Sequence, residues 1–144
     1  MLGDAVNLAS RLEGVNKEYS TRILVSESTF RHVADSVAPY SRPLLFRQLD
    51  WIRVKGKQQP VAIYELLGFA GDSSTDYAKL VELYDTALQA YRWQQWDVAL
   101  EVFDAILRQY PHDGPAQLMA ARCRDFRAAP PPPDWDGVYE MKTK

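Results

Sequence analysis

The sequence has one cysteine, Cys123, and only two histidines, His32 and His112, and this scarcity limits its chemistry. A single thiol excludes a disulfide framework within the chain. The histidines are isolated from each other and from the cysteine, so no Cys/His cluster has the spacing of a metal site. Both observations fit a reducing compartment.

The sequence also lacks a strong charge of one sign and a long apolar run. Its net charge is -2, with 17 basic and 19 acidic residues interspersed, so nucleic acid is not expected as a partner. No apolar run approaches the roughly 20 residues of a membrane helix, and no signal peptide is recognisable. The composition, 47% hydrophobic and 25% charged, is that of one globular domain, or of a small domain with an appendage.

What the sequence does contain is a helical pattern near its start. Apolar side chains recur there at spacings of four, three and four residues: Leu8, Leu12, Val15 and Tyr19. This period predicts a helix with one face toward a core. Asn7 and Arg11, four residues apart, lie on a neighbouring face at the edge of that stripe, where a helix borders a cleft. Asp4 stands at the expected N-cap.

The residues Gly-Asp-Ala-Val-Asn-Leu-Ala-Ser-Arg-Leu-Glu at positions 3–13 resemble the transition-state motif of class III nucleotidyl cyclases, which make cyclic AMP or cyclic GMP. The resemblance implies that Asn7 orients the ribose and that Arg11 neutralises charge on the α-phosphate. A permanently protonated guanidinium suits phosphoryl transfer, which depends mostly on positioning and positive charge. The alternative is an ordinary amphipathic helix whose Asn7 and Arg11 are solvated.

A hairpin is predicted further along the chain. Residues 21–25 read as a strand buried on both faces, and Ser26 as the N-cap of a helix. Residues 45–55 and 61–66 read as two strands joined by a turn. Around this turn, Val-Lys-Gly-Lys at 54–57 resembles the end of the same cyclase domain, which implies that Lys55 reaches the triphosphate. A solubilising lysine at a hairpin tip is the alternative.

The resemblance covers residues 1–67 and implies a partial α+β, ferredoxin-like cyclase domain, its back half. In the family, two Mg or Mn ions are held by a pair of aspartates that precede the Asn/Arg helix, and nothing here matches them. We therefore expect a fragment that is inactive alone and lacks metal ligands of its own. A second cyclase subunit, in a homodimer, is the expected partner. The resemblance implies ATP or GTP as the substrate. It leaves the choice between them open, because the residues that select the base in the family also precede the motif.

Residues 68–76 are rich in Gly and Ser and predict a linker. Residues 77–127 have helical periodicity and predict antiparallel helices, which resemble a single tetratricopeptide repeat. Residues 128–144 predict a Pro-rich spacer and a tail that docks on the body through Trp135 and Tyr139, with a loose tail as the alternative. The helical segment is interpreted either as a dimerisation or partner platform or as a packed structural appendix.

This order of segments is similar to that of bacterial membrane-bound cyclases with a CHASE-type sensor. It implies an inner-membrane anchor in upstream segments, with this part on the cytoplasmic side. The expected function is that of part of an adenylate cyclase, converting ATP to cyclic AMP and pyrophosphate in signal transduction. The alternative is a non-catalytic interaction module, with a degenerate cyclase half and binding helices.

Overall fold

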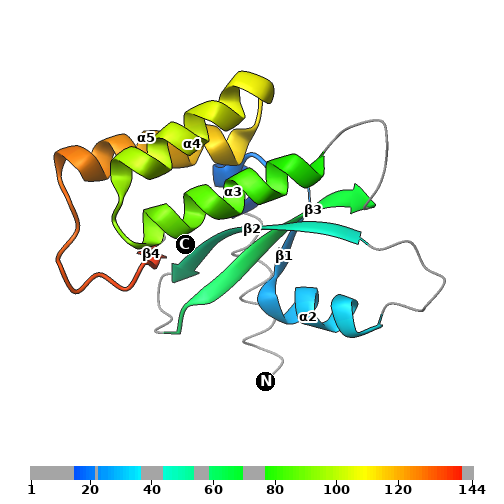
Figure 1. Ribbon diagram of the computed structural model, residues 1–144. Helices are drawn as coiled ribbons and strands as arrows, with labels where there is room; N and C mark the ends of the chain where they lie inside the picture. The colour runs from blue at the N-terminus through cyan, green and yellow to red at the C-terminus, as the bar shows by residue number, and fades with distance from the viewer. Residues whose placement is uncertain (1–14, 22, 37–43, 54–58, 70–76, 141–144) are drawn as a thin grey trace.

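The computed structural model describes residues 15–21, 23–36, 44–53, 59–69 and 77–140 (Figure 1). Residues 15–19 form a helical turn. The elements that follow are β1 (Leu24–Ser26), α2 (Glu27–Ser36), β2 (Leu44–Arg53), β3 (Val61–Phe69), α3 (Tyr77–Arg92), α4 (Trp96–Gln109), α5 (Gly114–Ala128) and β4 (Tyr139–Glu140). Strands come first and helices dominate the second part, so the α+β class predicted from the sequence is confirmed.

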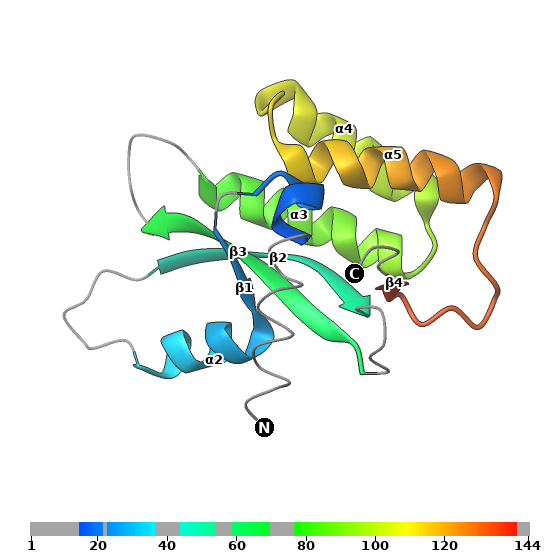
Figure 2. The same ribbon diagram turned by 180° about the vertical axis from the view of Figure 1, so that it is seen from behind.

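The four strands form one sheet in the order β1-β3-β2-β4. Strands β2 and β3 are an antiparallel hairpin, as predicted, with Ile52 opposite Val61 at its closed end. β4, from the end of the chain, pairs in parallel with β2. Helices α3, α4 and α5 lie on one side of the sheet and α2 lies on the other (Figures 1 and 2).

The prediction for the first strand was partly wrong. β1 begins only at Leu24, because the amide of Thr21 still bonds to the carbonyl of Asn16 in the preceding turn. Leu24 and Val25, which point to opposite faces of the sheet, are only half-buried, and Ile23 before them is 50% exposed, so the strand is not buried on both faces. The predicted cap after it is confirmed, since the Ser26 hydroxyl accepts the Thr29 amide at 3.2 Å.

The three later helices follow the predicted periodicity. The buried residues of α3 and α4 recur at helical spacing and face one another: Leu80, Tyr84, Ala87, Leu88, Tyr91, Trp96, Ala99, Leu100, Phe103 and Ile106. Gln94, in the turn between α3 and α4, adopts φ 60°, the left-handed conformation for which glycine is usual. Asp113 caps α5 by accepting the Ala116 amide, and Pro115 occupies its first turn.

The helices and the sheet share a core. Helix α3 lies across β2, and the Tyr84 hydroxyl donates to the Leu49 carbonyl at 2.9 Å. Val15 and Tyr19, from the helical turn before β1, are buried in this same core. In the part of the chain that the structure describes, no helix combines the length and apolar character needed to cross a membrane.

Candidate functional site

The sequence-predicted site residues, Asn7, Arg11 and Lys55, lie outside the described residues. The structure does, however, describe what adjoins them. Four residues after Arg11, the helical turn 15–19 begins, and its Val15 and Tyr19 are 1% and 0% exposed. These two residues end the predicted apolar stripe, so the prediction that this stripe faces a core is confirmed for the part that is described.

The structure also describes the strand that leads to Lys55. β2 runs to Arg53 and is paired on one side with β3 and on the other with β4. Arg53 donates to Asp136 at 3.0 Å and to Glu140 at 3.1 Å, so the tail binds beside the closed end of the hairpin. The tail itself is folded, because the Trp135 indole donates to the Val138 carbonyl at 3.1 Å. The approach to Lys55 is therefore held between two neighbouring strands.

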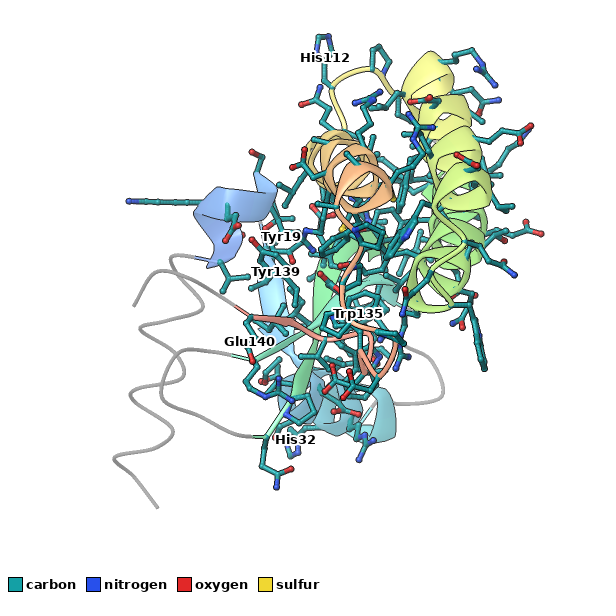
Figure 3. All side chains as sticks on the ribbon, turned by 90° about the vertical axis from the view of Figure 1, so that its left-hand side faces the viewer. Tyr19, His32, His112, Trp135, Tyr139 and Glu140 are labelled. Carbon is teal, nitrogen blue, oxygen red and sulfur yellow. The ribbon has the colours of Figure 1, made fainter. Side chains whose placement is uncertain are left out.

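A buried polar cluster joins these two regions to α5. The Arg122 guanidinium donates to the Asp50 carboxylate at 2.6 Å and to the Tyr19 hydroxyl at 3.3 Å. The Tyr19 hydroxyl in turn donates to the same Asp50 oxygen, Oδ2, at 2.8 Å. Figure 3 shows Tyr19 near Tyr139, whose ring covers Arg122 with 3.5 Å between the guanidinium carbon and the ring centroid. The cluster is a closed network of groups from four elements.

The environment shifts the acid–base properties of this cluster. Burial raises the pKa of Asp50, while the charge of Arg122 and the Tyr19 hydroxyl oppose that rise. Burial alone would lower the pKa of Arg122, but Tyr19 and Asp50 outweigh it, and the pKa is raised. Desolvation also raises the pKa of the Tyr19 phenol well above its ordinary value. The guanidinium therefore remains protonated, and the phenol remains a donor, at physiological pH.

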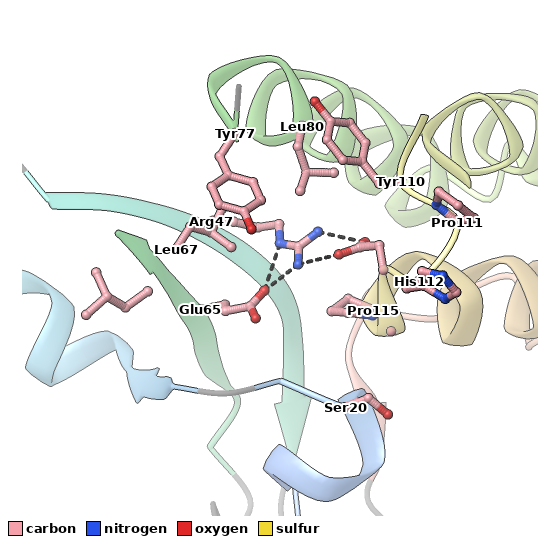
Figure 4. Close-up of a pocket in the computed structure, with 13 residues that line it drawn as sticks. Ser20, Arg47, Glu65, Leu67, Tyr77, Leu80, Tyr110, Pro111, His112 and Pro115 are labelled. Atoms are coloured by element: carbon pink, nitrogen blue, oxygen red, sulfur yellow. Dashed lines mark hydrogen bonds and ion pairs between the residues drawn. The ribbon is translucent and has the colours of Figure 1, made fainter. Parts of the chain in front are cut away.

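A second buried arginine lies near the other end of the contact between sheet and helices. Arg47 is 1% exposed and lies between Glu65 and Asp113 (Figure 4). Its pKa is raised, because the two carboxylates outweigh the effect of burial. A cavity of about 380 Å³ opens beside it, with Tyr77, Tyr110 and His112 among its lining residues. Since Arg47 is already bound to two carboxylates, this arrangement suits a structural contact better than an anion site.

The sequence analysis missed both buried arginines. Arg122 had a visible signal, because it follows Met119 by three residues and Leu118 by four, which places it on the apolar face of α5. The signal for Arg47 and Asp50 was weaker: both are charged residues within a predicted strand that is otherwise mostly apolar. Within residues 15–140, excluding the undescribed gaps, no group of three or more His, Cys, Asp or Glu side chains is arranged to hold a metal ion.

In comparison with known proteins, the chain is similar to proteins named adenylate cyclases. One, from Dictyostelium discoideum and named terminal-differentiation specific, is 34% identical over 123 residues, which are 85% of this chain and 6% of that protein. The adenylate cyclase of Anabaena cylindrica is 43% identical over 67 residues, 46% of this chain and 12% of that protein. Adenylate cyclase 1 of Rhizobium meliloti (strain 1021) is 40% identical over 67 residues, 46% of this chain and 9% of that protein.

The chain thus spans between 6% and 12% of the length of these relatives. The match that takes in 85% of the chain includes residues of both the sheet and the helices that follow it. No protein-family model and no solved structure matches the chain. The named relatives support a relationship to the nucleotidyl cyclases, the family that the motif at residues 3–13 resembles.

Proposed function

We propose that this chain is part of an adenylate cyclase that converts ATP to cyclic AMP and pyrophosphate in signal transduction. The observation that carries the proposal is the similarity to a named adenylate cyclase over 123 residues, in a chain that also holds the motif with Asn7 and Arg11. The names of the relatives favour ATP over GTP as the substrate.

Each proposed site residue has a distinct role. Asn7 hydrogen-bonds the ribose and so orients the attacking 3′-hydroxyl. Arg11 places a fixed positive charge where negative charge develops on the α-phosphate as pyrophosphate leaves. Lys55, in the connection between β2 and β3, binds the triphosphate through a flexible ammonium group, which suits a group that is held and then released.

The proposed site needs components that these residues do not supply. Two Mg or Mn ions, held by the other half of a cyclase domain, would activate the hydroxyl and neutralise the phosphates. Because the Asn/Arg side of one subunit faces the metal side of another in the family, a homodimer follows, and this chain alone is inactive. Membrane anchoring through a CHASE-type sensor, with this part on the cytoplasmic side, belongs to the same proposal.

The first test is genomic and biochemical. The longest reading frame that contains this sequence is expected to encode a Phe-x-Asp strand, a second aspartate and base-selecting residues before Gly3. The purified product should form cyclic AMP from ATP with Mg or Mn. In it, Arg11→Ala should lower kcat at least about 100-fold, the loss typical of removing one transition-state donor, and leave dimerisation intact.

The matched control is Arg31→Ala, which removes an arginine that is exposed on α2 and paired with Glu27. It should keep wild-type turnover. Retained turnover in the Arg11→Ala variant refutes the assignment. A frame that starts at Met1 with no metal-binding half, and a product that binds a protein partner without turnover, identify the interaction module instead.

A further inference from the structure

We propose, on the basis of the cyclase function above, that Arg122 of α5 is a positioning residue for the nucleotide site. Its guanidinium fixes the segment that leads to Arg11 relative to the strand that leads to Lys55. The helices that follow the sheet would then help to hold the catalytic residues in place. This gives the helical segment a role that neither a partner platform nor a passive appendix describes.

The first observation is that one guanidinium binds both segments at once. Its NH1 group donates to Asp50 on β2 at 2.6 Å, and its NH2 group donates to Tyr19 at 3.3 Å. The bond from Tyr19 to Asp50, 2.8 Å, closes the triangle. Because a guanidinium is planar and its donors are fixed in a fork, both partners are held in one relative placement.

The second observation is where these partners lie in the chain. Tyr19 follows Arg11 by eight residues, which is about 12 Å along the helix that the sequence predicts over this stretch. Asp50 lies in β2, three residues before the strand ends at Arg53, and precedes Lys55 by five residues in the sequence. Arg122 therefore joins the described parts of the two segments in which the proposed site residues Arg11 and Lys55 occur.

The third observation is a second contact between α5 and the same turn. Gly114, in the first turn of α5, packs so closely on Ser20 that a Cβ there would lie 2.5 Å from the Ser20 Cβ. Two turns further along α5, Arg122 contacts Tyr19. A helix that contacts one segment at two points restricts rotation as well as translation of that segment, which one contact alone does not.

The cluster is also closed to water. Asp50 is 0% exposed and Arg122 is 6% exposed. The Tyr139 ring covers the guanidinium, and the Trp51 amide donates to the second Asp50 oxygen at 2.8 Å. A buried charge pair of this kind is satisfied in one arrangement only, which suits the fixing of geometry better than the gain of stability. Misplacement of a catalytic group by about 1 Å can cost about 100-fold in rate.

The test uses the active full-length cyclase that contains this sequence and variants Arg122→Gln, Arg122→Lys and Tyr19→Phe. Assays are run well below each variant's midpoint of unfolding, so that all molecules are folded. Arg122→Gln should lower kcat at least about tenfold with the KM for ATP within about twofold of wild type, because the transition-state residue is displaced and ground-state binding is not. Arg122→Lys keeps the charge but not the fork, and should lower kcat similarly.

The matched control is Arg124→Gln, which makes the same change at an exposed arginine of α5, paired with Asp104 at 3.5 Å. It should leave kcat and KM unchanged. Tyr19→Phe removes one hydroxyl and keeps the ring, so it should fold and lower kcat about threefold or more. In an Arg11→Lys background, whose remaining activity no longer depends on the guanidinium, Arg122→Gln should add less than about twofold.

The outcomes separate the two proposals. If the wild-type enzyme is active and Arg11→Ala abolishes turnover, but folded Arg122→Gln and Tyr19→Phe keep wild-type kcat, Arg122 is purely structural and this inference is overturned alone. A lowered midpoint of unfolding with unchanged kcat has the same meaning. If the wild-type enzyme has no cyclase activity, or Arg11→Ala keeps it, the proposed function is overturned and this role of Arg122 with it.

Discussion

The contact between α3 and α4 and the contact between the sheet and the helices are both apolar, but the second also contains buried ion pairs. Between α3 and α4, aromatic and aliphatic side chains meet: Tyr84 lies edge-on to Phe103 at 5.4 Å, and Tyr91 to Trp96 at 5.6 Å, between ring centroids. Between sheet and helices, two buried arginines form ion pairs: Arg47 of β2 binds Asp113 at the start of α5, and Arg122 of α5 binds Asp50 of β2.

This difference determines what each contact can specify. Apolar packing is not directional, and it tolerates small shifts at modest cost. A buried ion pair is strongly favourable only when donors and acceptors meet at hydrogen-bond distance, and it is costly otherwise. Apolar stripes therefore drive both the folding of the helical hairpin and its packing on the sheet, whereas the buried ion pairs add the directional contacts that restrict how the helices sit there.

The largest effect is expected from breaking a charged contact. Asp50→Ala leaves the Arg122 guanidinium buried without its carboxylate partner and should lower the free energy of unfolding by about 3–5 kcal/mol. Urea denaturation followed by circular dichroism measures the change. Asp97→Ala, which removes an 83% exposed partner of Arg127, is the control and should cost no more than about 1 kcal/mol. A loss below about 1 kcal/mol for Asp50→Ala would contradict the comparison.

An apolar replacement sharpens the same test. If Asp50→Leu, Arg122→Met and Tyr19→Phe are combined, no buried charge of the cluster is left unpaired, and the Trp51 amide and the Tyr91 hydroxyl are the polar groups that lose a partner. Stability should then lie well above that of Asp50→Ala and near the wild-type value, since a well-packed apolar cluster often replaces a buried ion pair without loss. Such a variant would be stable but would lack the fixed placement of Tyr19 relative to β2.

The sequence predicted the apolar contact far better than the charged one. Periodicity places Tyr84, Ala87 and Phe103 on inward faces without any knowledge of their partners. The charged contacts could not be predicted, because Arg122 and Asp50 are 72 residues apart and periodicity contains no information about which distant groups meet. The motif with Asn7 and Arg11 was recognised from residue types alone, and its geometry stays a prediction, because those residues lie outside the described part.

We expect the thiol of Cys123, which is buried among the helices, to stay protonated at a pH at which an exposed thiol is ionised. Burial raises the pKa of the Cys123 thiol to about 12, whereas an unfolded chain ionises it near about 8.5. Above pH 8.5 the unfolded state therefore binds fewer protons than the folded state, and stability falls as pH rises, by up to about 1.4 kcal/mol per unit. Urea midpoints at about pH 8 and about pH 9.5 measure this slope.

Cys123→Ser is the control for that slope, because serine does not titrate. It should be less stable at pH 8 but should lose less with rising pH. The buried tyrosines, whose pKa values burial raises as well, contribute above about pH 10 in both proteins, so the comparison is made below that value. An equal slope in the two proteins would show that the thiol is accessible to water in the folded state.

The smallest effect is expected from the apolar contact itself. Ile106 of α4 is 0% exposed and belongs to the shared core, yet Ile106→Val removes one methylene and leaves no polar group unpaired. The cost is expected to be about 1 kcal/mol, within the 0.5–1.5 kcal/mol typical of this change. Urea denaturation of the variant beside Asp50→Ala gives the ratio of the two effects. A cost for Ile106→Val that matches the Asp50→Ala value would mean that close packing of the hairpin, and not the buried charges, sets the helices on the sheet.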